Sequence, residues 1–228
     1  MENLFLHYMH ERVRREEEQS VQEPGPVITI SREYGCYGSE IGELLTNRIN
    51  QNRAENESWF FVSHQVLHDA ADSLETSPHE ISHIFGAKEK SVLGDLVSLF
   101  SKDKYLSDIQ IKRTIAQIVR SYSEQGNAVI VGRAGCVIAK HIKRSVHVKL
   151  MAPFCWRVNV IKNRFNISSS EATEKVKETD KQRETFMEFF RGNKPDNDHF
   201  DLILNRSTVS SEEIVDHIIS LAEKRGLL

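Results

Sequence analysis

The amino-acid sequence predicts an α/β protein in which helices flank a parallel, doubly wound sheet of five strands. Five short runs rich in apolar and β-branched residues support this class, and they cover residues 27–30, 59–62, 128–131, 146–150 and 200–204. Segments in which apolar residues recur at helical spacing separate these runs. Such alternation is typical of parallel strands joined by right-handed crossovers.

The first run leads into a glycine turn and then into a helix. Gly35 and Gly38 lie in the turn, and Ile41, Leu45 and Ile49 recur at helical spacing after it. This order of elements offers backbone N–H groups and a helix N-terminus to an anion, and glycine allows the backbone to approach closely. Two interpretations stay open on spacing alone, a phosphate-binding loop and a plain turn between strand and helix.

The Walker A pattern, G-x-x-x-x-G-K-[ST], is incomplete in this turn. Gly38 and Ser39 stand where Gly-Lys is expected, so the phosphate-binding lysine is absent. Arg32 is the nearest cation in the sequence. If the turn binds phosphate, backbone amides must supply most of the contacts.

The composition predicts one cytoplasmic domain that binds neither nucleic acid nor a membrane. The chain has 228 residues, 39% hydrophobic and 28% charged, and a net charge of −3. This charge gives no global attraction to nucleic acid or anionic lipid, and no basic patch with interleaved aromatic residues is present. No apolar run is long enough for a membrane span, and the first residues lack a signal-peptide core.

The cysteines and histidines do not indicate a metal site. Cys36, Cys136 and Cys155 are too few and too scattered for disulfides or metal binding, and free thiols fit a reducing compartment. Cys36 could be a low-pKa thiol at a helix N-terminus, but a small loop residue is the simpler interpretation. The spacings of the histidines are not those of a zinc site, and these residues are His64, His68, His79 and His83.

Arginines mark the C-terminal half. Arg133 follows the third run directly, at the sheet edge where parallel α/β proteins bind ligands, and its planar fork suits a phosphate. Arg157 and Arg164 lie nearly two turns apart on one predicted helix. A second predicted helix begins at the capping box of Ser168 and carries Asp180 and Arg183 on one face. Ordinary surface pairing would also explain these charges.

Several of these segments resemble the motifs of the cytidylate kinase-like family, which is related to nucleoside monophosphate kinases. The first strand and turn are similar to the family's I-T-I-S-R-E-[FY]-G-S-G-G-R-E-I. Later segments are similar to V-I-V-G-R, D-x-x-R and Y-D-L-V-L-N. The matching residues are 28–35 with Gly38, Glu40 and Ile41, then 129–133, 180–183 and 200–205.

The resemblance implies a P-loop fold with strand order 2-3-1-4-5. It also implies a kinase-like domain over residues 26–228, with a helical insertion beside the acceptor over 64–106 and a lid-like helical pair over 154–192. The sequence itself predicts a helical extension over residues 1–25. The extension lies outside the resemblance. Its apolar residues could dock on the domain or on a second subunit, so a homodimer is possible.

The implied activity is transfer of a phosphoryl group from ATP, with Mg²⁺, to a small acceptor, by default a nucleoside monophosphate such as CMP. Arg133 would hold the acceptor, and Ser31 or Ser39 could touch Mg²⁺. The phosphate-binding residues would be Ser31, Gly35, Cys36, Tyr37, Gly38, Ser39 and Glu40. The catalytic residues would be Arg32, Arg157, Arg164, Asp180 and Arg183, with Arg32 replacing the missing lysine and Asp180 orienting an arginine or the lid.

Two departures from the family pattern favour an alternative function. The lysine is missing, and Ser63-His64 stands where the family usually carries an aspartate just past the second strand. Loss of a central cation without a replacement could abolish transfer and leave binding. The alternative is therefore a nucleotide-binding sensor or interaction protein without turnover.

Overall fold

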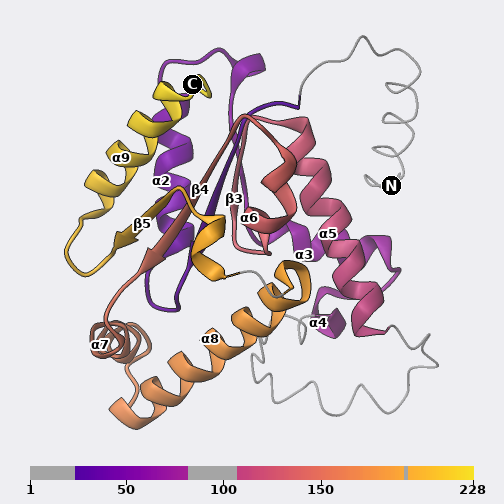
Figure 1. Cartoon of the computed structure of the whole chain (residues 1–228). Coiled ribbons are helices and arrows are strands. Elements are labelled where there is room, and N and C mark those ends of the chain that lie inside the picture. Colours follow the sequence, from indigo (N-terminus) through magenta and orange to yellow (C-terminus); the bar gives the residue numbers. More distant parts are fainter. Residues whose placement is uncertain (1–23, 82–106, 193–194) are drawn as a thin grey trace.

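The computed structural model describes residues 24–81, 107–192 and 195–228, which form a five-stranded parallel sheet with helices on both faces (Figure 1). The strand order is β2-β3-β1-β4-β5, as predicted. The strands are β1 (Val27–Arg32), β2 (Phe60–Val62), β3 (Ala128–Val131), β4 (Ser145–Met151) and β5 (Leu202–Asn205). The central strands are the most apolar because both of their faces are covered.

Helices connect the strands. They are α2 (Gly38–Asn50), α3 (Gln65–Ser73), α4 (Pro78–Ile81), α5 (Asp108–Gln125), α6 (Gly135–Ile138), α7 (Phe154–Phe165), α8 (Ser169–Arg191) and α9 (Ser211–Lys224). The predicted capping box of α8 is present, since the side chains of Ser168 and Glu171 each accept from the other residue's backbone N–H. Ser210 and Glu213 form the same motif at α9.

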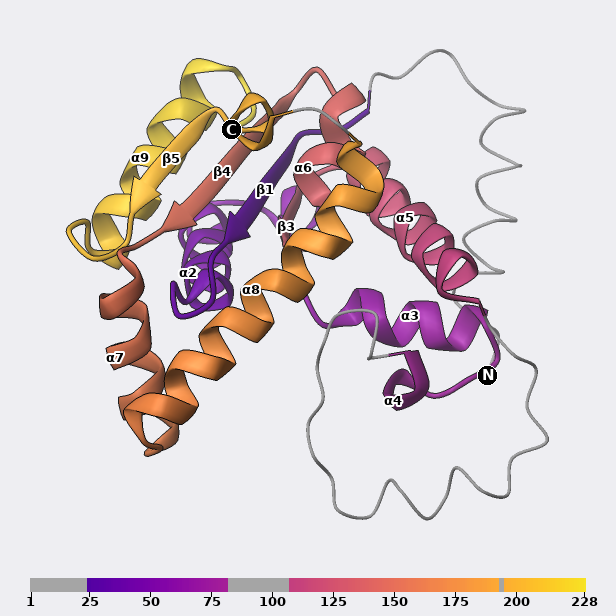
Figure 2. The same cartoon turned by 60° about the horizontal axis from the view of Figure 1, so that its bottom comes forward.

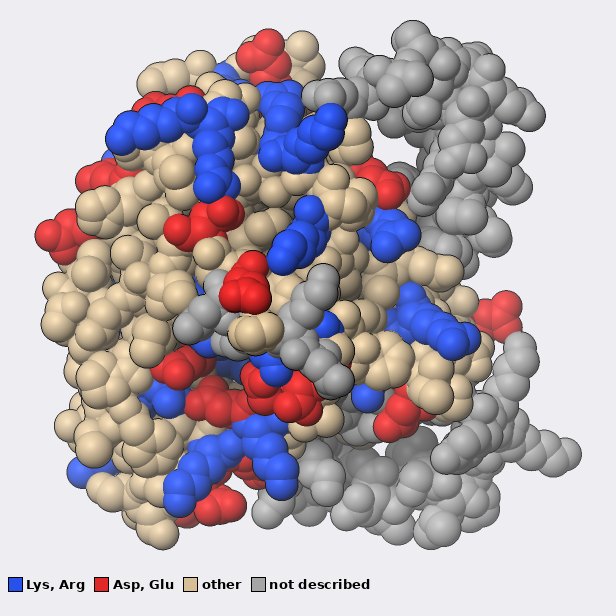
Figure 3. Space-filling model, in the orientation of Figure 1, with Lys and Arg blue, Asp and Glu red and all other residues tan. Residues whose placement is uncertain are grey.

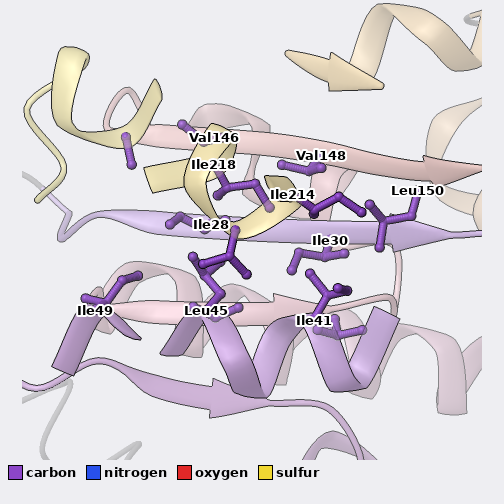
Figure 4. Close-up of a cluster of buried hydrophobic side chains, with 14 of the residues drawn as sticks. Ile28, Ile30, Ile41, Leu45, Ile49, Val146, Val148, Leu150, Ile214 and Ile218 are labelled. Atoms are coloured by element: carbon purple, nitrogen blue, oxygen red, sulfur yellow. The ribbon is translucent and has the colours of Figure 1, made fainter. Parts of the chain in front are cut away.

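Two apolar cores lie on opposite faces of the sheet. Figure 4 shows the first, in which Ile41 and Leu45 of α2 and Ile214 of α9 pack against β1 and β4. The second core joins the other faces of β1 and β3 to helices α3, α5 and α6 and to Phe186 of α8. Burial on both faces fixes the sheet, so the ends of its strands are a rigid platform.

Two of the predicted regions lie partly or wholly outside the described residues. The helical extension over residues 1–25 is described only from residue 24 onward, and the insertion over 64–106 only as far as residue 81. The predicted lid over 154–192 contains α7 and α8, which pack against each other. Its action as a lid stays a prediction.

No helix within the described ranges is both long enough and apolar enough to span a membrane. On the face drawn in Figure 3, acidic and basic side chains are interspersed, without a broad area of one sign. This distribution agrees with the small net charge of −3.

A buried histidine of β4, His147, lies beside its paired residue Thr29 of β1. His147 is 8% exposed, and both ring nitrogens meet hydroxyls: Nδ1 lies 2.8 Å from Thr29 Oγ1, and Nε2 lies 3.3 Å from Ser145 Oγ. Burial lowers the pKa of His147 to about 4. The ring is therefore neutral in the folded protein at neutral pH.

We expect the free energy of unfolding to fall as the pH decreases from about 6.5 to about 4. In this range His147 is protonated in the unfolded chain but stays neutral in the folded chain, so protons stabilise the unfolded state. At about 1.4 kcal/mol per pH unit, the full effect is about 3 kcal/mol. Urea unfolding at several pH values, compared with the variant His147→Asn, measures it. The free energy of unfolding of the variant should depend less steeply on pH than that of the wild type. An equal dependence in the two proteins would contradict the low pKa of His147.

Candidate functional site

The C-terminal ends of three neighbouring strands meet at one edge of the sheet. Ile30 of β1 pairs with Val131 of β3, and Val62 of β2 pairs with Ile130. The residues that follow these strands therefore leave the sheet side by side. Helices α7 and α8 lie beyond this edge (Figures 1 and 2). Ligands of open parallel sheets bind at such an edge.

Three arginines converge here from β1, β3 and α8. Burial and the charges of Arg183 and Arg133 lower the pKa of Arg32 well below its ordinary value. Burial and the charge of Arg183 lower the pKa of Arg133 to about 10, and burial lowers that of Arg183. We call Arg32, Arg133 and Arg183 the arginine cluster. Desolvated like charges are costly, so an anion that binds among them gains free energy.

The side chain of Arg32 runs from the start of α2 to the end of β3. A Cβ atom at Gly38 would lie 2.8 Å from Arg32 Cγ, and one at Gly132 would lie 2.1 Å from Arg32 Nη1. The two glycines therefore make room for Arg32. This packing explains why position 38, in the incomplete Walker A pattern, carries no side chain.

The substitution Gly132→Ala should displace the Arg32 guanidinium and strain the backbone, because φ at Gly132 is +78°. We expect pyrophosphate to bind about tenfold more weakly, as for the loss of one charge-assisted hydrogen bond. Isothermal titration calorimetry measures the affinity. Gly226→Ala is the matched control, since φ is +68° and no atom lies within 4 Å of the added Cβ. Equal affinities in the two variants would contradict the packing argument.

Helices α7 and α8 hold the backbone of the glycine turn. Asp180 Oδ1 accepts from Tyr34 N at 2.7 Å, Arg157 Nη1 donates to Tyr34 O at 3.2 Å, and Arg183 Nη1 donates to Arg32 O at 3.2 Å. The Arg183 guanidinium also lies 5.3 Å from the centre of the Tyr34 ring. The D-x-x-R segment therefore contacts the turn through Asp180 and Arg183, its first and last residues.

Arg157 is the centre of a buried ion network. Its side chain is 8% exposed; Nη1 lies 2.5 Å from Asp180 Oδ2, and Nε lies 3.2 Å from Glu33 Oε2. Nε also donates to Ala152 O at 3.0 Å, and Ala152 N donates to the same Glu33 carboxylate. These contacts position the turn. A direct catalytic role for Arg157 or Asp180 stays a prediction.

Arg164 lies apart from the arginine cluster. It is half-exposed on α7, pairs with Glu40 at 3.1 Å, and lies 5.0 Å from the centre of the Tyr37 ring. These contacts join α7 to the first turn of α2. Its predicted catalytic role depends on a movement of α7 and stays a prediction.

The remaining residues of the turn are mostly enclosed. Tyr37 adopts a left-handed conformation immediately before α2, and Ser39 is half-buried in the first turn of that helix. Ser31 is buried and donates to Cys136 Sγ at 3.5 Å. Burial and the charge of Glu33 raise the pKa of Cys36 to about 12, so its thiol is protonated at neutral pH. Gly35 has a φ of +94° and lies against Arg157.

His64 also lies at this edge, although the sequence pattern indicates only a departure from the family motif there and does not fit a metal site. It follows β2 immediately before α3. Burial and the charges of Arg133 and Arg32 lower its pKa. The signal that could have identified it is its place at the carboxyl end of a predicted parallel strand.

The donors at this edge fit a polyphosphate better than a bare metal ion. Within the described ranges, no group of three or more His, Cys, Asp or Glu side chains could hold a metal. Glu33 and Asp180, two carboxylates beside the turn, both pair with Arg157, and Glu40 pairs with Arg164. Guanidinium groups, by contrast, match phosphate oxygens in charge and geometry.

The comparisons with known proteins agree with this geometry. A model of the cytidylate kinase-like family matches residues 27–208. The solved structure of an uncharacterized protein from Eubacterium ventriosum superposes with a TM-score of 0.61 at 17% identity, and covers 87% of this chain and 98% of that chain. Shikimate kinase from Bacteroides thetaiotaomicron has a TM-score of 0.50 at 11% identity, with the same coverage. These two likenesses show that the α/β fold is shared with solved structures.

A further match adds nothing about activity. Uronate isomerase from Corynebacterium glutamicum is 25% identical over 109 residues, which make up 47% of this chain. The chain spans 21% of the length of that curated relative.

Proposed function

Because this chain belongs to the cytidylate kinase-like family, we propose that it is a nucleotide kinase that transfers a phosphoryl group from ATP to a nucleoside monophosphate such as CMP. The observation that carries the proposal is the arginine cluster. Burial lowers the pKa of all three guanidinium groups at the carboxyl edge of the sheet, and neighbouring like charges of the cluster lower the pKa of Arg32 and Arg133 further. A substrate with several phosphate groups would compensate this repulsion.

The glycine turn would bind the donor phosphates. Asp180, Arg157 and Arg183 hold the backbone at Arg32 and Tyr34, so the start of the turn is positioned before the ligand arrives. Such preorganisation lowers the cost of stabilising charge during transfer. The turn would cradle the phosphates from Gly35 to Glu40.

The arginine cluster would bring donor and acceptor together. Arg133 would hold the acceptor phosphate, and Arg32 and Arg183 would neutralise charge on the moving group. In the transfer, the bond between the terminal phosphorus of ATP and its bridging oxygen breaks, and an oxygen of the acceptor phosphate forms the new bond. ADP leaves, and the monophosphate becomes a diphosphate. Alignment and neutralisation are the protein's main contributions to this chemistry.

Mg²⁺ would be held chiefly by the phosphate oxygens of the nucleotide and by water, because Glu33 and Asp180 pair with Arg157 and Glu40 pairs with Arg164. The half-buried hydroxyl of Ser39 is the protein ligand we propose. When bound, Mg²⁺ supplies charge neutralisation on the phosphates.

A panel of nucleoside monophosphates incubated with ATP and Mg²⁺ tests the proposal. We expect a nucleoside diphosphate from at least one acceptor, and its loss in Arg133→Ala, which excludes a contaminating kinase. A thermal shift with ATP and Mg²⁺ measures binding separately. Binding without transfer to any acceptor would contradict the kinase function.

A second candidate is a nucleotide-binding sensor without turnover. It is favoured by the position of Arg32, whose guanidinium lies against Gly132 at the end of β3 and not over the turn where a Walker A lysine would act. The same panel separates the two candidates.

A further inference from the structure

His64 lies at the same sheet edge as the glycine that accommodates the Arg32 guanidinium. Val62, the last residue of β2, is paired with Ile130 of β3, so His64 and Gly132 each follow a paired residue by two positions at this edge. The Arg32 guanidinium lies against Gly132, and Arg133 follows directly. His64 is exposed at this edge, so its imidazole is accessible to a ligand.

Cations dominate the surroundings of His64. Arg133 from the end of β3, Arg32 from the end of β1 and His68 from α3 disfavour its protonated form, as does partial burial. Glu43 from α2 is the one facing group that favours protonation among the residues the structure describes. Without a ligand, the imidazole is therefore neutral at neutral pH. An anion bound among these cations would instead favour the protonated form of His64.

We infer that His64 is a fourth anion-binding group of the site, and that it takes up a proton when a phosphate group binds to the arginine cluster. The inference rests on the proposed function only in placing phosphate at that cluster. A bound dianion cancels the charges of Arg32 and Arg133, which then no longer oppose protonation of the ring. The protonated ring in turn attracts the anion. By thermodynamic linkage, the factor by which the anion raises the proton affinity of His64 equals the factor by which protonation raises the anion affinity.

This arrangement selects for ligand charge. A dianionic phosphate monoester binds more tightly when protonated His64 adds a fourth cation to the site, whereas the affinity for a neutral hydroxyl compound does not change. The aspartate of the family pattern would act in the opposite direction at this position, since a carboxylate repels phosphate. His64 therefore favours an acceptor that presents a dianionic phosphate to the edge of β2.

Nuclear magnetic resonance titration of the full chain tests the linkage. Sulfate is the probe, because it stays dianionic over the pH range in which histidine titrates, whereas phosphate does not. We expect sulfate to raise the pKa of His64 by about one relative to chloride at the same ionic strength, which corresponds to about a tenfold preference for the protonated form. The variant His64→Gln assigns the resonance, and His68 is an internal control.

The affinity for sulfate gives a second readout. When the pH is lowered from 8 to 5.5, we expect the affinity of the wild-type protein for sulfate to rise about tenfold. The affinity of His68→Gln should rise by the same factor, and the affinity of His64→Gln should not change. His64→Asp should bind more weakly than His64→Gln throughout. Equal pH dependence in wild type and His64→Gln, or a His64 pKa that sulfate does not move, would overturn the inference. Either result leaves the kinase proposal intact, whereas a wild-type protein that binds no anion overturns both.

Discussion

The variant Arg32→Met is expected to lose phosphoryl transfer by about a thousandfold or more while it unfolds no more easily than wild type. A cation that stabilises the moving phosphoryl group is worth about 10³–10⁵ in rate. Methionine keeps an apolar stem in the space between Gly38 and Gly132. It also removes a desolvated charge that Arg133 and Arg183 repel, which should raise the free energy of unfolding by about 1 kcal/mol. Steady-state kinetics and urea unfolding measure the two effects.

The matched control is Arg48→Met at the far end of α2. Arg48 is 35% exposed and pairs with Glu212 and Asp216, both on the surface. Its loss should change stability by less than about 1 kcal/mol and leave transfer unchanged. A clear destabilisation of Arg32→Met would show that Arg32 is a structural residue, and unimpaired transfer would show that it does not contact the reacting phosphates.

The sheet could be predicted because its signal is local. Each central strand is a short apolar run that is buried on both faces, and the helices carry apolar residues at helical spacing. Strand order came from the resemblance, since spacing along the chain does not specify which strands pair. Bounds were less accurate: β4 begins one residue earlier and ends one later than expected, and β5 begins at Leu202 instead of residue 200. The edge strand β5 has a weaker pattern because it is less buried than the inner strands.

The site was harder to predict because its contacts cross long distances in the sequence. Arg32, Arg133 and Arg183 were all selected as candidates, but no pattern showed that their guanidinium groups share one desolvated place. The engagement of Arg157 by Glu33 and Asp180 depends on how α7 and α8 pack beside the turn. Such packing is decided by tertiary structure, so a sequence can identify a charged residue without showing whether it faces a ligand or a carboxylate.

The variant Arg157→Met should lower the free energy of unfolding by about 3 kcal/mol. Arg157 is 8% exposed and joins Glu33, Asp180 and the carbonyl of Tyr34. Its removal leaves two carboxylates together without their cation, and breaking such a pair costs about 3–5 kcal/mol, with the low end expected because both carboxylates are partly exposed. Urea unfolding at neutral pH measures the loss.

Two further variants test whether the loss of stability comes from the ion network of Arg157 or simply from the removal of an arginine side chain from α7. Arg164→Met, on the same helix, removes a half-exposed arginine paired with Glu40, and should change stability by less than about 1 kcal/mol. The double variant Arg157→Met/Asp180→Asn should recover part of the loss, because one of the two unpaired carboxylates is gone. If the double variant is no more stable than Arg157→Met, repulsion between the carboxylates is not the cause. The loss would then come from the hydrogen bonds to the turn, and α7 and α8 would stabilise that turn through its backbone rather than through charge.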